Sequence, residues 1–139
     1  MNRSTTVVVA GIFLCALSLV LLQQRFDASD HAKAERLLRH FRVEAGPETF
    51  EDFLVHKTQR RGTWATEITG GCRGVVRVRC LIDGNPPEVH EWDVEIPSQA
   101  IHPTPASPSG ERLLREFTGQ ALPLPALRLP PPDAAPAKE

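Results

Sequence analysis

The side chains best suited to chemistry are two cysteines and a histidine between residues 70 and 90. Cys72 and Cys80 are separated by seven residues in the stretch GGCRGVVRVRC. Two thiols can form a disulfide, bind a metal ion or act separately, and a cysteine beside a histidine such as His90 can be a nucleophile. Seven intervening residues do not match a zinc spacing, and no second Cys/His pair completes four ligands. The sequence therefore predicts no metal site.

Acidic side chains form a second candidate group. Glu91, Asp93 and Glu95 alternate along one segment and could bind a cation, but Arg77 and Arg79 are expected opposite them as charge partners. The chain has no G-x-S-x-G motif and no glycine loop for a phosphate. Its net charge of −1 gives no electrostatic basis for nucleic-acid binding. We expect a protein that is not an enzyme, needs no cofactor and binds no nucleic acid.

The elements that carry these residues are predicted strands. From residue 63 onward the hydrophobic period is two, which is typical of strands with one buried face. Three segments alternate, at 63–69, 75–82 and 88–96, and the turn-forming sequences GGCRG and DGNPP separate them. The pattern predicts a three-stranded antiparallel meander.

The register of this meander follows from its side chains. Pairing Ile82 with Glu88, and Thr69 with Val75, makes one face apolar and places opposite charges opposite each other on the other face. The expected pairs are Val78–Trp92, Val76–Val94, Arg79–Glu91, Arg77–Asp93, Ile68–Val76, Trp64–Cys80 and Glu67–Arg77. A slip of one residue would bury the arginines, so this register is strongly specified.

This register separates the two cysteines. Cys72 falls at the tip of the first turn, and Cys80 falls on the apolar face of the central strand. Eight residues of strand span roughly 26 Å, whereas a disulfide needs Cα atoms within about 7 Å. A Cys72–Cys80 bridge remains an alternative that would require the strand to begin later. Otherwise Cys80 is a buried thiol and Cys72 is an exposed one.

Five residues on the apolar face form the candidate ligand-binding or packing face: Trp64, Val78, Cys80, His90 and Trp92. Two tryptophans on one face fit a ligand pocket between sheet and helices, but they fit a hydrophobic core better. A Cys–His pair on the packing face of a small sheet is also more typical of a core than of a catalytic site. We therefore expect this face to pack against helices.

Three segments outside the strands have helical periodicity. They span 29–42, 47–57 and 110–119, and each has an apolar stripe that predicts packing on the sheet. Residues 97–109 contain several prolines and are expected to form a loop. The tail 120–139 has six prolines, which exclude helix and central strand, so polyproline II or disorder is expected there. A docking segment that uses the leucines of the tail is the alternative.

The N-terminal segment 1–24 is a predicted transmembrane helix. Residues 7–22 contain no charge and no proline, and as a helix they span about 24 Å. Flanking polar residues extend this towards the roughly 30 Å hydrocarbon core. A cleaved signal peptide is the alternative, but the A-x-A motif at 32–34 lies about ten residues beyond the apolar run, inside a predicted helix. We expect a retained anchor that contacts the membrane through residues 7–22.

Two sequence features give opposite predictions of the membrane orientation. Only Arg3 precedes the apolar run, whereas Arg25, Lys33 and further arginines follow it, which taken literally keeps the domain in the cytoplasm. That rule weakens for long translocated domains, and the short N-terminal tail is typical of an export signal. We expect a bacterial inner (cytoplasmic) membrane protein with its C-terminal domain outside the cytoplasm. The alternative is a secreted or periplasmic protein after signal cleavage.

The predicted fold class is therefore α+β. It consists of an N-terminal transmembrane helix or signal segment (1–24), a small extracytoplasmic domain (25–119) and a disordered proline-rich tail (120–139). The domain contains two short helices, the meander and one further short helix. Because strands 63–69 and 88–96 each have an open edge, a partner strand could add there. This favours a non-catalytic interaction or accessory subunit of an envelope assembly, with a small-ligand-binding module as the alternative.

Overall fold

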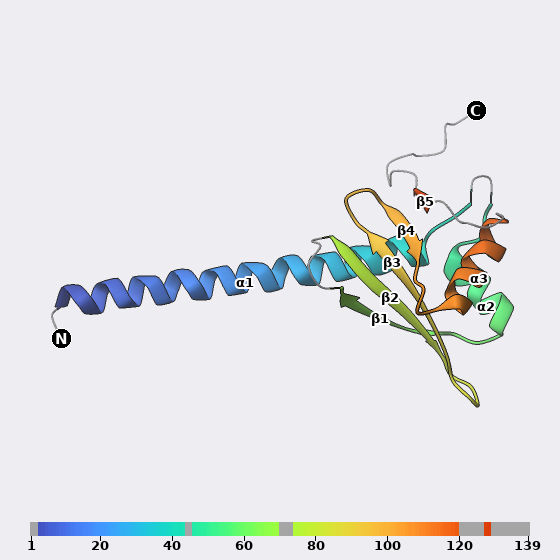
Figure 1. The fold of residues 1–139 in the computed structure, drawn as a ribbon, viewed down its shortest axis with the longest axis horizontal. Coiled ribbons are helices and arrows are strands. Elements are labelled where there is room, and N and C mark those ends of the chain that lie inside the picture. The colour runs from blue at the N-terminus through green and yellow to red at the C-terminus, as the bar shows by residue number, and fades with distance from the viewer. Residues whose placement is uncertain (1–2, 44–45, 70–73, 120–126, 129–139) are drawn as a thin grey trace.

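A long helix projects from a domain built of an antiparallel sheet and shorter helices (Figure 1). The structure is a computed structural model, and it describes residues 3–43, 46–69, 74–119 and 127–128. The chain has the predicted α+β class, with one long apolar helix at its N-terminus. The differences from prediction concern where helices begin and how many strands the sheet has.

The N-terminal helix α1 (Arg3–Arg39) is one continuous element. A separate helix over 29–42 was expected, and this break is wrong because the stretch QQRFDAS at 23–29 contains no glycine or proline to interrupt the helix. At 1.5 Å per residue α1 is about 55 Å long. Its side chains from Val8 to Leu22 are exposed, whereas Ala34 and Leu38 are fully buried in the domain.

The two short helices begin at different residues from those predicted. Helix α2 (Phe50–Thr58) begins after Thr49, because the Thr49 and Asp52 side chains form a capping box. The hydrogen bonds from Thr49 lower the pKa of Asp52. Helix α3 (Pro108–Thr118) begins two residues before its predicted start, where Ser107 is the N-cap.

The sheet contains β1 (Thr63–Ile68), β2 (Val75–Ile82), β3 (Glu88–Glu95), β4 (Ala100–Pro103) and β5 (Leu127–Arg128). These strands lie in sequence order, and each neighbouring pair is antiparallel. The predicted register of the first three strands is confirmed. Trp64 pairs with Cys80, Val78 pairs with Trp92, and the remaining expected pairs within these strands are also formed.

Two short strands extend the sheet beyond the meander. β4 pairs with β3 over Trp92–Glu95, so this half of the β3 edge that was expected to be open is covered. The prediction of a loop over 97–109 is wrong at β4, because Pro103 stands at the strand end, where a missing N–H is tolerated. β5 pairs with β4 and corrects the prediction of disorder at residues 127–128. The rest of the tail lies outside the described residues.

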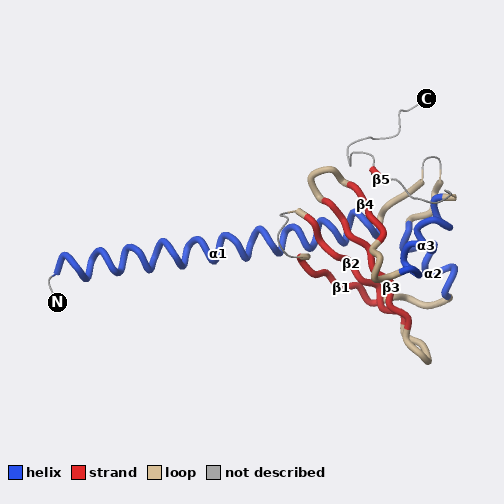
Figure 2. The backbone as a smooth tube through the Cα atoms, in the orientation of Figure 1, coloured by secondary structure: helices blue, strands red, loops and turns tan. Residues whose placement is uncertain are grey.

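Helices cover one face of the sheet, as predicted (Figure 2). Phe50 of α2 meets the Trp92 ring edge-to-face, with centroids 5.2 Å apart at 84°. The core residues contributed by helices are Ala34, Leu38, Phe50, Leu54, Leu113 and Leu114, and Phe41 joins them from the segment after α1. Those contributed by strands are Val76, Val78, Cys80, Ile82, Trp92, Val94 and Ile101. The hydrophobic core therefore fills the space between the sheet and the helices.

Candidate functional site

The predicted ligand or packing face lies beneath the helices. Val78, Cys80, His90 and Trp92 are at most 3% exposed. Trp64, on the edge strand β1, is half-buried and packs against the same core. The structure therefore brings all five predicted residues together, as part of a packed core.

Specific contacts hold the two tryptophans in this core. The Trp92 Nε1 donates a hydrogen bond to the Gly110 carbonyl at 2.8 Å. The Arg39 guanidinium lies 5.8 Å from the centre of the Trp64 ring, within the range of a cation–π contact. Glu35 and Glu51 bind the same guanidinium, at 2.6 and 2.8 Å, and the Glu51 hydrogen bond is the main cause of its raised pKa. Trp64 is thus covered by an arginine that is itself fixed.

Cys80 is placed as a small apolar side chain rather than as a nucleophile. It is a free thiol opposite His90 in the register. Burial raises the pKa of Cys80 to about 12, so very little thiolate exists at neutral pH. A Cβ added at Gly62 would overlap the Cys80 sulfur, which shows how closely the strand entry packs on it. Cys72, predicted at the turn tip, lies outside the described residues.

The hydrogen-bond partner of His90 is a serine. Its Nδ1 lies 2.9 Å from the Ser109 hydroxyl, and its Nε2 lies 3.4 Å from a Glu88 carboxylate oxygen. Burial lowers the pKa of His90, against the opposing effect of Glu88, so the imidazole is neutral at pH 7. Serine, histidine and glutamate are the groups of an acyl-transfer triad, but such a site also needs free N–H donors for an oxyanion. The Gly110 N–H beside Ser109 is already bonded to Ser107.

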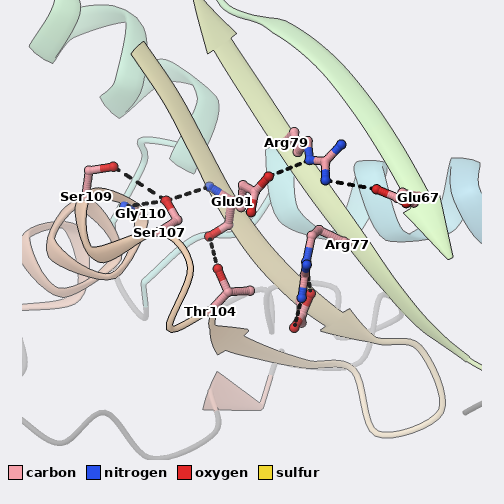
Figure 3. A network of polar contacts seen from close by, with 9 residues as sticks. Glu67, Arg77, Arg79, Glu91, Thr104, Ser107, Ser109 and Gly110 are labelled. Carbon is pink, nitrogen blue, oxygen red and sulfur yellow. Dashed lines mark hydrogen bonds and ion pairs between the residues drawn. The ribbon is translucent and has the colours of Figure 1, made fainter. Parts of the chain in front are cut away.

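A network of hydroxyl groups ties the start of α3 to β3 (Figure 3). The Ser107 Oγ accepts hydrogen bonds from the N–H of Gly110 at 3.2 Å and from the N–H of Glu91 at 3.0 Å. Thr104 donates to the Glu91 carbonyl at 3.4 Å. A Cβ at Gly110 would lie 2.6 Å from that carbonyl, so only glycine allows this approach. Sequence analysis missed this network, although Ser107 followed by Pro108 is a helix-start signal.

The opposite face of the sheet carries the predicted ion pairs Arg77–Asp93 and Arg79–Glu91, whereas Glu67 is bonded to Arg79 rather than to Arg77 (Figure 3). Arg77 donates to both carboxylate oxygens of Asp93, at 2.9 and 3.2 Å. Arg79 bridges Glu91 and Glu67, the latter at 2.9 Å. Across the described ranges, no group of three or more His, Cys, Asp or Glu side chains could hold a metal ion. The carboxylates of Glu91 and Asp93 are engaged by arginines.

The free edge of β1 is the first exposed feature with functional potential. β1 pairs with β2 on one side, and no described residue pairs with its other side. Thr63, Ala65 and Glu67 are exposed along this strand and share the charged face of the sheet. The main-chain groups of an edge strand can bind an added strand.

A groove opens where α1 leaves the domain, with a volume of about 850 Å³. Its α1 wall includes Leu19, Leu22 and Phe26, and Asp27 and Asp30 follow further along the helix towards the domain. Its other wall is the end of the β1–β2 hairpin, including Ile68, Val75 and Val76. We call this the junction groove. Sequence analysis did not predict it, because it depends on the hairpin lying beside an unbroken α1.

Among the described residues, α1 is the one helix long and apolar enough to cross a membrane, over Val8–Arg39. The apolar part of this segment is not buried in the domain. Its length and composition are compatible with a single-pass anchor or with a signal sequence.

Comparison of the chain with protein-family models, with curated proteins and with solved structures finds no match in any of the three. Three structural features have functional potential: the apolar part of α1, the β1 edge and the junction groove.

Proposed function

We propose that this protein is a single-pass inner-membrane protein whose domain lies outside the cytoplasm and acts as a non-catalytic interaction subunit of an envelope assembly. The partner binds by adding an extended strand to β1. One observation carries this proposal: no described residue pairs with the outer edge of β1, and this strand belongs to a domain that is joined directly to an exposed apolar helix.

The chemistry of β1 indicates what the partner strand contains. Trp64 and Ile68 point to the helix-covered face, and Ile68 is 37% exposed, so apolar side chains are expected opposite them. Glu67 points to the charged face with its side chain 59% exposed, although Arg79 contacts it. A basic side chain opposite Glu67 would add a favourable cross-strand pair. The expected partner segment therefore alternates apolar with polar or basic residues.

The burial and protonation of Cys80 and His90 support a binding function over a catalytic one. Cys80 is protonated and buried, and His90 is enclosed between Ser109 and Glu88. Main-chain hydrogen bonds along a sheet edge need no such groups, because affinity comes from the strand itself and specificity from alternate side chains.

The proposal is tested by photo-crosslinking in membranes of the native host. A benzoylphenylalanine placed at Ala65, on the edge of β1, is expected to crosslink to one protein. The same group at Leu81, which is exposed on β2 of the same sheet face, is the matched control and is expected to give no such product. A synthetic peptide of the crosslinked segment should then slow hydrogen exchange of β1 amides and leave those of β4 unchanged.

Two variants sharpen the test. Ala65→Lys is expected to abolish the crosslink at a neighbouring β1 position, because an edge lysine opposes strand addition. Leu81→Lys is expected to leave it unchanged. A protein that purifies as a lone monomer with no crosslink at Ala65, or an equal yield at both positions, would contradict the proposal.

A further inference from the structure

We propose that phospholipids of the bilayer fill the junction groove, so that the domain is seated on the membrane surface rather than held away from it. This inference rests on the anchoring part of the proposed function and is independent of strand addition at β1.

The position of the groove along α1 carries the first step. About 20 helical residues span the hydrocarbon core, so an anchor over residues 5–24 places its boundary near Gln24. Leu19 then lies about 8 Å inside the core, and Phe26 lies about 3 Å outside it. Both residues line the groove. One end of the groove therefore opens into the hydrocarbon.

The side chains of the groove change from apolar to charged in the direction away from the membrane. Leu19 and Leu22 come first, Gln23 and Phe26 follow, and Asp27 and Asp30 come last. Asp30 lies about 9 Å beyond the boundary, outside a headgroup layer of about 5–7 Å. A phospholipid has the same order of chemistry, from acyl chain through glycerol and phosphate to water.

The second wall of the groove comes from the sheet. Ile68, Val75 and Val76 line it opposite the α1 side chains. α1 continues unbroken to the buried residues Ala34 and Leu38, which fixes the domain relative to the anchor. Ile68 and Phe26 are 37% and 67% exposed, and bilayer lipid would cover both.

Spin labels in the full-length chain test this arrangement. The background carries Cys15→Ala and Cys72→Ser, and it keeps Cys80, whose buried thiol resists labelling. Nitroxides are attached at Ile68→Cys in the groove, at Val89→Cys as the matched control and at Leu17→Cys in the anchor. Val89 is exposed and apolar like Ile68, but it lies about 17 Å further along the sheet, given the pairs Ile68–Val76 and Val89–Leu81.

The measurement compares relaxation by oxygen with relaxation by a water-soluble nickel chelate in phosphatidylcholine vesicles. The oxygen-to-nickel ratio at Ile68 is expected to be several-fold above that at Val89 and below that at Leu17. A water-like ratio at Ile68 beside a hydrocarbon-like ratio at Leu17 would overturn the seating while leaving the anchor intact. If Ile68 were shielded from both oxygen and the nickel chelate, a protein rather than lipid would fill the groove, such as a second copy of this chain. This result would overturn the proposed seating. A water-like ratio at Leu17 would overturn the anchor and the seating together.

Discussion

At the scale of single residues, Gly62 and Cys80 restrict each other. A Cβ on Gly62 would overlap the Cys80 sulfur, so Gly62→Ala is expected to overpack this site and lower the free energy of unfolding by about 1–3 kcal/mol. Adding Cys80→Ala removes the sulfur and should recover much of that loss. Urea unfolding of the two single variants and the double variant measures the coupling. Strictly additive effects would contradict the close contact.

Cys80 also allows a chemical test of burial. With a pKa of about 12, its thiolate fraction at pH 8 is about 1,000-fold smaller than that of an ordinary thiol with a pKa near 9. In the background lacking Cys15 and Cys72, a disulfide reagent is expected to leave native protein unmodified and to react fully in urea. Modification of the native protein at the rate of a free thiol would show that Cys80 is accessible.

At the scale of elements, the hydroxyl network predicts different costs for two neighbouring serines. Ser107→Ala leaves the buried N–H of Gly110 and the partly buried N–H of Glu91 without their acceptor, and should cost about 1–3 kcal/mol of unfolding free energy. Ser109→Ala removes a contact to His90 but leaves the cap in place, and should cost about 1 kcal/mol or less. Chemical denaturation compares them. A larger loss for Ser109 would indicate that the His90 contact, rather than the cap, is important.

The elements also show what the sequence could predict. The register of β1, β2 and β3 was predictable because Arg77, Arg79 and their partners must all leave the core together, and one slipped residue reverses every side chain. β4 was not predictable, because four residues ending in Pro103 have too little alternation to distinguish a strand from a loop. The contacts of Ser109 with His90 depend on how α3 docks, which no local pattern encodes.

At the scale of the whole molecule, α1 combines an exposed apolar part and a buried part in one helix. Its buried residues, Ala34 and Leu38, lie in the last two turns or so, and its exposed large apolar residues end at Phe26. The sequence predicted both parts but not their continuity, because polar residues at 23–29 match a linker as well as a solvated helical turn. Continuity matters because it gives the domain a fixed direction relative to the anchor.

Because the apolar part of α1 is separate from its buried part, we expect that the anchor can be removed without unfolding the domain. A chain beginning at Arg25 keeps Ala34, Leu38 and every other buried core side chain. It should be recovered in the soluble fraction with nearly unchanged urea unfolding. A chain beginning at Leu37 loses Ala34 and the turn that covers β1 and β2, and is expected not to fold. Circular dichroism compares the two truncations, and unfolding of the first would show that the anchor stabilises the domain.

The position of the A-x-A motif within α1 predicts that the anchor is retained in the mature protein. The A-x-A motif at 32–34 lies inside α1, and Ala34 is fully buried against the sheet. Cleavage after Ala34 would remove this residue from the core and begin the chain within the helix that covers the strands. Intact mass and N-terminal sequencing of protein from fractionated cells are therefore expected to find the apolar segment 7–22 still joined to the domain in the membrane fraction. A soluble species beginning near residue 35 would contradict both the retained anchor and the seating of the domain on the bilayer.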